Sequence, residues 1–101
     1  MADFVKIATA AEIGPGSVRK FDIAGKEIAV YNVDGSFFAT SNICPHQGGP
    51  LDEGILEGNS IVCPWHAWAF DVTTGVSPIN PRAKIDCYPV KLEGADILIK
   101  L

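Results

Sequence analysis

The sequence lacks the long apolar runs and basic tracts that mark membrane proteins and nucleic-acid-binding proteins. Although 48% of its 101 residues are hydrophobic, no stretch approaches the roughly 20 consecutive apolar residues of a membrane-spanning helix. The 8 basic residues are scattered among 12 acidic ones and leave a net charge of −4, so no cationic face for nucleic acid is expected. We therefore expect neither a membrane segment nor a nucleic-acid partner.

Cysteine and histidine are also scarce. Three cysteines cannot form an even disulfide framework, and the opening residues MADFVKIATAAEIG lack the basic start and apolar core of a signal peptide. These two features predict a cytoplasmic protein. We expect it to be a monomer.

The sequence offers no nucleophile–base pair and no phosphate-binding loop. By size, residues 1–101 are one domain, too short to hold a cofactor domain and a separate substrate domain. We therefore predict that the protein is not an enzyme. A partner must supply the substrate site for any redox reaction that it serves.

Short runs rich in β-branched and aromatic residues alternate with turn residues, which is typical of an all-β domain. The run at 26–33 leads through Asp34-Gly35 to another at 36–40, and an Asp-Gly pair between two such runs is a strong hairpin signal. Further strands are expected at 55–56, 60–62, 67–72, 88–92 and 97–101. The only helical candidate is one turn at 9–12, a capping box that Gly14-Pro15-Gly16 stops at once.

Two segments, CPHQGGPL at 44–51 and CPWH at 63–66, carry proline or glycine where strand pairing would fail, so we expect loops at about 43–51 and 63–68. They contain both histidines, spaced as Cys-x-His and Cys-x-x-His. Two ligands on one loop can reach different metal atoms, and a [2Fe–2S] cluster with two thiolates on one iron and two imidazoles on the other fits this content. The candidate metal and cofactor ligands are Cys44, His46, Cys63 and His66.

Two other interpretations of these four residues stay open at this point. The first is a mononuclear zinc site in a binding module without redox activity, because two cysteines and two histidines are a common structural zinc set. Zinc loops more often pair Cys with Cys and His with His, so Cys-x-His is unusual there. The second is that the four side chains bind nothing and are buried thiols and ordinary histidines.

Both segments resemble the two cluster-binding boxes of Rieske proteins, and the resemblance extends over most of the chain. It implies that Cys44 and Cys63 bind one iron and that His46 and His66 bind the other. It also implies a Rieske fold of three stacked antiparallel sheets, with one [2Fe–2S] cluster held by two loops. A third, proline-containing loop is expected to cover the cluster, and Ser77-Pro78-Ile79-Asn80-Pro81 is the candidate for it.

The boxes differ from those of the respiratory Rieske proteins at four positions. Gly49 and Trp65 stand where those proteins have bridging cysteines. Trp68 and Phe70 stand where they place serine and tyrosine hydroxyls against the cluster sulfurs. Because each missing hydrogen bond leaves more electron density on sulfur, the resemblance implies a potential near the bottom of the Rieske range, roughly −150 mV.

The chain looks like the soluble Rieske ferredoxins of aromatic-ring-hydroxylating dioxygenase systems. That similarity implies a carrier of single electrons from a flavin-dependent reductase to a terminal oxygenase. The alternative is the Rieske small subunit of a NAD(P)H-dependent nitrite reductase, which shares both size and motif. Nothing in the sequence separates the two systems.

Residues beside the ligands carry further predictions. Leu51 and Trp65 are candidates for an apolar collar that limits water and docks the partner, whereas Trp68 is expected in the core. Cys87 lies in a strand-like segment and is expected to be a buried structural thiol.

Acidic residues follow the first segment closely, at Asp52, Glu53 and Glu57. They either help to select a basic partner surface or belong to an ordinary solvated hairpin.

Overall fold

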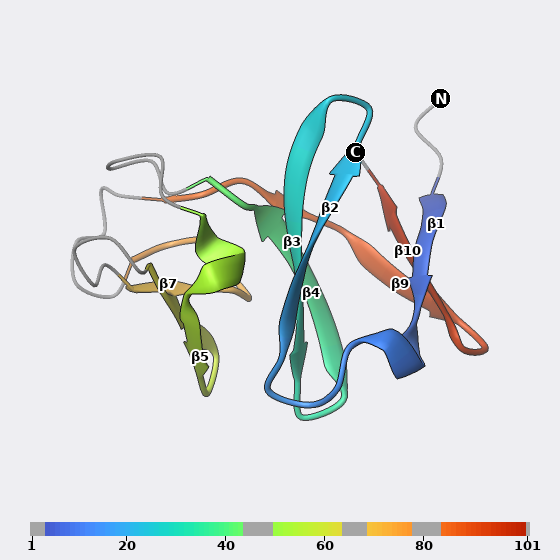
Figure 1. Ribbon diagram of the computed structural model, residues 1–101, viewed down its shortest axis with the longest axis horizontal. Helices are drawn as coiled ribbons and strands as arrows, with labels where there is room; N and C mark the ends of the chain where they lie inside the picture. Colours follow the sequence, from blue (N-terminus) through green and yellow to red (C-terminus); the bar gives the residue numbers. More distant parts are fainter. Residues whose placement is uncertain (1–3, 44–49, 64–68, 78–83, 101) are drawn as a thin grey trace.

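Strand β3 (Lys26–Val33) has both of its faces buried. The computed structural model describes residues 4–43, 50–63, 69–77 and 84–100 (Figure 1). Because successive strand residues point to opposite faces of a sheet, Ile28 and Val30 enter one apolar cluster while Ala29 and Tyr31 enter another. A strand buried on both sides explains the almost unbroken apolar run at 28–31.

Three antiparallel sheets are stacked side by side (Figure 1). The central sheet has the order β2-β3-β4-β8, with β2 at Val18–Ile23, β4 at Ser36–Ser41 and β8 at Cys87–Tyr88. One outer sheet has the order β1-β10-β9, with β1 at Phe4–Thr9, β9 at Val90–Glu93 and β10 at Asp96–Lys100. The other has the order β5-β6-β7, with β5 at Ile55–Glu57, β6 at Ser60–Val62 and β7 at Ala69–Asp71. This confirms the predicted all-β fold of three stacked sheets.

Two apolar clusters hold the layers together, one on each face of the central sheet. The first apolar cluster includes the buried residues Ala29, Tyr31, Leu51, Ile61, Cys63, Phe70, Val72 and Ile85. The second includes Ala8, Ile13, Ile28, Val30, Ala39, Ile97 and Ile99. Each large apolar side chain buried in this way contributes about 1.5–3 kcal/mol. Since β3 supplies residues to both clusters, we infer that the chain folds as one domain.

The predicted turn residues occupy the positions that require them. Asp34 and Gly35 have φ values of 50° and 91° and join β3 to β4 with Val33 opposite Ser36. Positive φ at both central residues is the geometry that matches the twist of a two-residue hairpin. The capping box is also confirmed: Ala10–Glu12 form one 3₁₀ turn, and the Thr9 amide donates to the Glu12 carboxylate. That backbone hydrogen bond holds the pKa of Glu12 below its ordinary value.

Strands β1 and β2 were not predicted. In β1 the neighbours Val5 and Lys6 are both exposed, and the register shifts between Lys6 and Ala8, so the strand shows no regular alternation. Strand β2 is an edge strand that carries charged residues toward both faces. The predicted strand at 88–92 is divided at Pro89 into β8 and β9 because proline has no N–H to continue a ladder. Within the described ranges, no helix has the length and apolar character needed to cross a membrane.

Candidate metal centre

Cys63 follows directly on strand β6 and is only 1% exposed. It packs in the first apolar cluster together with Leu51 and Ile85. Leu51 comes two residues after the segment 44–49, and Ile85 comes two residues after the segment 78–83. Three chain segments, including both with predicted ligands, are therefore anchored on one buried cluster around Cys63.

The ends of the first segment are joined by a dense set of hydrogen bonds. The Leu51 amide donates to the Asn42 carbonyl at 2.8 Å, and Ile43 and Pro50 form an antiparallel bridge. The Asn42 side chain adds two hydrogen bonds to Asp52: Nδ2 donates to the Asp52 carboxylate at 2.8 Å, and Oδ1 accepts from the Asp52 amide at 2.8 Å. The segment that carries Cys44 and His46 thus leaves and returns at closely tied positions.

Strand pairing ties the other two segments in the same way. Residues 64–68 lie between Val62 and Ala69, which are paired across β6 and β7. Residues 78–83 lie between Val76 and Lys84, which form an isolated antiparallel bridge. The Ile85 amide strengthens this closure by donating to the Gly75 carbonyl at 2.7 Å.

Gly54 links the first segment to the second. It follows a 3₁₀ turn at Leu51–Glu53, and its amide donates to the Leu51 carbonyl at 3.0 Å. A Cβ atom at position 54 would overlap the carbonyl oxygen of Val62, the residue before Cys63. Only glycine lets these two backbones approach so closely.

Of the four predicted ligands, the structure describes Cys63. Cys44, His46 and His66 lie outside the described residues, as do Trp65 and Trp68. Across the described ranges, no group of three or more His, Cys, Asp and Glu side chains is placed to hold a metal ion. The donor chemistry nevertheless fits a [2Fe–2S] cluster, because each of the two segments supplies one cysteine and one histidine and both are tied back to a single buried cluster.

Phe70 extends the apolar surroundings of this centre. It is fully buried and belongs to the same cluster as Cys63. The side chain has no hydroxyl, so it cannot donate a hydrogen bond to a sulfur nearby. The prediction of a low potential depends on this lack of a donor.

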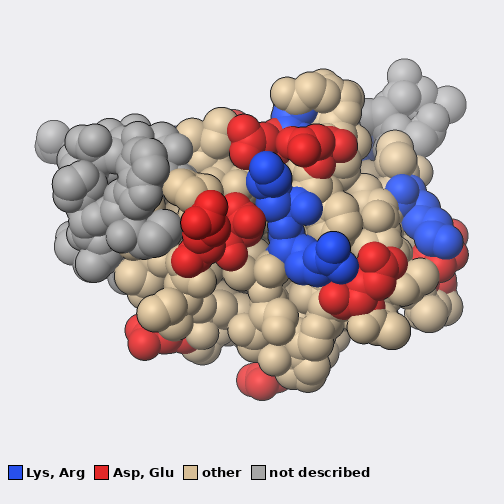
Figure 2. Space-filling view, in the orientation of Figure 1, with Lys and Arg blue, Asp and Glu red and all other residues tan. Residues whose placement is uncertain are grey.

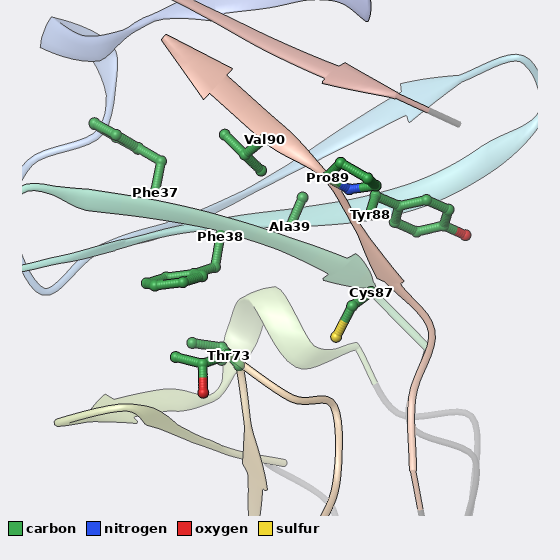
Figure 3. A pocket seen from close by; sticks show the side chains of 9 residues that line it. Phe37, Phe38, Ala39, Thr73, Cys87, Tyr88, Pro89 and Val90 are labelled. Carbon is green, nitrogen blue, oxygen red and sulfur yellow. The ribbon is translucent and has the colours of Figure 1, made fainter. Parts of the chain in front are cut away.

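Two predictions about neighbouring side chains are wrong. Leu51 is 0% exposed and so cannot be part of a collar that docks a partner; its place is in the core. Cys87 is exposed rather than buried because β8 is the edge strand of the central sheet. It lines a shallow hollow of about 220 Å³ with Phe38, Thr73 and other residues (Figure 3). Partial burial there, followed by the charges of Asp86 and Asp71, raises the pKa of the Cys87 thiol.

Acidic residues outnumber basic ones in the described part of the chain between residues 50 and 87. The described residues between 50 and 87 include one basic side chain, Lys84, and five acidic ones, Asp52, Glu53, Glu57, Asp71 and Asp86. Asp52 is half-buried and bonded to Asn42, whereas Glu53 and Glu57 are exposed. On the face in Figure 2, lysines and arginines lie among acidic residues. The sequence suggested a partner role for Asp52, but its pairing with Asn42 was not foreseen because ten residues separate the two.

Comparison with known proteins places this centre in a family. Residues 3–89 match the model of the Rieske [2Fe–2S] domain. The chain is 39% identical over 100 residues to the ferredoxin component of naphthalene 1,2-dioxygenase/salicylate 5-hydroxylase systems of Ralstonia sp, covering 98% of this chain and 96% of that one.

Solved structures of other proteins are also similar to this chain. A chain in the complex of reduced oxygenase and oxidized ferredoxin in carbazole 1,9a-dioxygenase superimposes with a TM-score of 0.88 at 31% identity, covering 96% of this chain and 92% of that chain. The putative NADH-dependent nitrite reductase small subunit from Mycobacterium tuberculosis gives a TM-score of 0.92 at 21% identity, covering 100% of this chain and 96% of that one. This last likeness concerns the fold alone.

Proposed function

The chain belongs to the Rieske [2Fe–2S] domain family, and we propose that Cys44, His46, Cys63 and His66 hold its cluster. Family membership decides for the [2Fe–2S] cluster over a zinc ion. The observation that carries the ligand assignment is the burial of Cys63 in an apolar cluster on which the segment of Cys44 and His46 is also anchored. Two cysteines on one iron and two histidines on the other is the arrangement that the Rieske type requires.

The protein is a ferredoxin: it transfers electrons to the oxygenase of a dioxygenase system and is not itself a catalyst. The relatives named above serve naphthalene and carbazole dioxygenases. The nitrite reductase alternative rests on fold likeness alone. No contact or charge in the described residues favours it.

A [2Fe–2S] cluster supplies a one-electron redox couple, and the residues of this chain determine how that couple is held. Cys63 keeps its side chain away from water within the first apolar cluster. The described residues at the ends of the three segments are paired with one another, which sets where each segment leaves and rejoins the fold. Phe70 lies in the same apolar cluster as Cys63 and has no hydroxyl to donate to a cluster sulfur. For that reason we propose a midpoint potential near the lower limit of the Rieske range.

The other partner is proposed to be a flavin-dependent reductase that draws electrons from a nicotinamide nucleotide. Because such nucleotides are cytoplasmic electron sources, we also propose a cytoplasmic location. The exposed carboxylates of Glu53 and Glu57 favour a basic docking face on a partner.

Spectroscopy of the purified protein tests the ligand assignment. The oxidised protein should be reddish-brown, and after reduction its EPR spectrum should have the low average g value of mixed His/Cys ligation. His46→Ala and His66→Ala should each abolish that signal, while Cys87→Ala should leave it intact. A colourless, EPR-silent protein containing zinc would contradict the proposal.

Function is tested by reconstitution. The reduced wild-type protein should support turnover of an aromatic-ring-hydroxylating oxygenase supplied with a flavin reductase and NADH. His66→Ala, which lacks the signal, is the matched negative control. Failure of every oxygenase tested, together with turnover of a nitrite reductase, would transfer the assignment to the alternative system.

A further inference from the structure

Asn42 is a buried polar residue at the exit of strand β4, and its side chain is 1% exposed. Its backbone carbonyl accepts from the Leu51 amide, its side-chain Oδ1 accepts from the Asp52 amide, and its Nδ2 donates to the Asp52 carboxylate, each at 2.8 Å. The Asn42 amide also donates to the Glu27 carbonyl at 2.9 Å, which ties the residue to β3. Through its backbone amide and its side chain together, this one residue joins the central sheet to the return of the first ligand segment.

The placement of these hydrogen bonds gives them a consequence beyond stability. They close the chain between residues 42 and 52, and that interval contains Cys44 and His46. On the return side, Leu51 sits in the same apolar cluster as Cys63. The Asn42–Asp52 pair therefore sets where the segment with Cys44 and His46 leaves and rejoins the fold, relative to Cys63.

We propose that Asn42 and Asp52 are positioning residues for the cluster: their reciprocal pair sets the spacing between the Cys44–His46 segment and Cys63. This rests on the ligand assignment proposed above. A rigid closure holds four ligands near the geometry that the cluster needs, and loosening it lowers the barrier to loss of the cluster. Residues that orient ligands without touching the metal commonly change metal affinity by about 10–100-fold when removed.

The chain contains a matched control in Asn32. This asparagine is also buried, and its side chain makes the same kind of bonds: Nδ2 donates to the Ile13 carbonyl at 2.7 Å, and Oδ1 accepts from the Gly35 amide at 2.7 Å. These bonds join other parts of the chain and enclose no proposed ligand. Asn32→Ala should therefore lower stability as Asn42→Ala does, without acting on the cluster.

The first experiment compares Asn42→Ala with Asn32→Ala in the cluster-loaded protein. Three quantities are measured: the melting temperature, the rate of cluster release to an iron chelator, and the EPR g values after reduction. Asn42→Ala should speed release by about 10-fold and shift the g values and midpoint potential. Asn32→Ala should lower the melting temperature but leave the g values, the potential and the release rate near those of the wild type.

The second experiment exchanges the donor and acceptor. In Asn42→Asp two carboxylates face each other without a hydrogen between them, so release should be fast. In Asp52→Asn the amide oxygen still accepts from Asn42, so the effect should be small. The double variant N42D/D52N restores a donor opposite an acceptor at unchanged net charge, and it should return the release rate and g values toward wild-type values. Such rescue would show that residues 42 and 52 are energetically coupled, because two substitutions that act independently cannot restore each other's loss.

The outcomes separate this inference from the function on which it rests. If the wild type has no Rieske EPR signal, the ligand assignment fails first. If the wild type has the signal and Asn42→Ala releases the cluster no faster than Asn32→Ala, the positioning role is wrong. Absence of rescue in N42D/D52N, with both single variants folded, would also overturn it.

Discussion

The carbonyl oxygen of Val62 lies against Gly54 so closely that a single methyl group at residue 54 would overlap it. Gly54 ends the 3₁₀ turn after the first ligand segment, and Val62 precedes the proposed ligand Cys63. This backbone contact therefore joins the two segments that supply the proposed ligands.

Gly54→Ala should force the two segments apart. Overpacking of this kind costs about 1–3 kcal/mol of unfolding free energy, and the displaced segment should release the cluster faster. Denaturant unfolding and chelator-induced bleaching measure the two effects. Gly14→Ala is the control, because the nearest atom to a Cβ there is the Ser17 hydroxyl oxygen at 4.0 Å. Equal effects at both glycines would mean that the contact with Val62 has no special role.

The midpoint potential should lie near the lower end of the Rieske range, roughly −150 mV. The reason is that Phe70, buried in the same apolar cluster as Cys63, offers no hydroxyl to a sulfur. A redox titration followed by EPR measures the midpoint potential. A value above about +100 mV would contradict the low-potential assignment. Phe70→Tyr should shift the midpoint upward, because a donor to sulfur favours the reduced state.

The sequence predicted those parts of the fold that depend on local chemistry. Asp34 and Gly35 adopt the positive φ values that their hairpin needs, and the capping box at Thr9 and Glu12 forms as expected. Strand β1 escaped prediction because its bulge at Lys6–Ala8 disrupts alternation. A bulge depends on pairing with β10, which is about ninety residues away along the chain.

In the metal centre, too, local features could be predicted from the sequence, whereas features that depend on contacts between distant segments could not. The Rieske boxes identify the family from residue types and spacing alone, as the family match over residues 3–89 confirms. The roles of Asn42 and Leu51 depend instead on which segments meet in space. Its place beside the ligands in sequence makes Leu51 a candidate for an apolar collar, yet folding buries it completely. The ligand assignment of Cys44, His46, Cys63 and His66 stays a prediction for the experiments above.

Cys87 should react slowly with alkylating reagents at neutral pH even though it is exposed. Partial burial, with Asp86 and Asp71 nearby, raises the pKa of its thiol, so less of the reactive thiolate is present below that pKa. The iodoacetamide rate in the cluster-loaded protein should therefore reach half of its plateau at a pH above the ordinary thiol value. Cys87→Ala provides the blank. A half-maximal rate below the ordinary value would show that the neighbouring charges and burial have been misjudged.

Glu53 and Glu57 should speed encounter with an electron-transfer partner that has a basic face. Both carboxylates are exposed: Glu53 is the last residue of the turn at Leu51–Glu53, and Glu57 is the last residue of β5. The double variant E53K/E57K should slow association at low ionic strength by about 10-fold or more, and the difference should shrink as salt is added. Stopped-flow oxidation of the reduced ferredoxin by the oxygenase measures the rate.

The control for this charge reversal is Glu93→Lys with Asp34→Lys, which changes the net charge equally. Glu93 lies in the outer sheet of β1, β10 and β9, and Asp34 lies in the β3–β4 turn. If attraction depends only on the net charge of −4, both double variants should slow association alike. A local docking role predicts that the control keeps nearly the wild-type rate when both variants are compared at about 0.1 M salt, where charges more than a Debye length of about 10 Å from the contact are screened. Equal slowing by the two variants would leave Glu53 and Glu57 as ordinary solvated residues of the β5 hairpin.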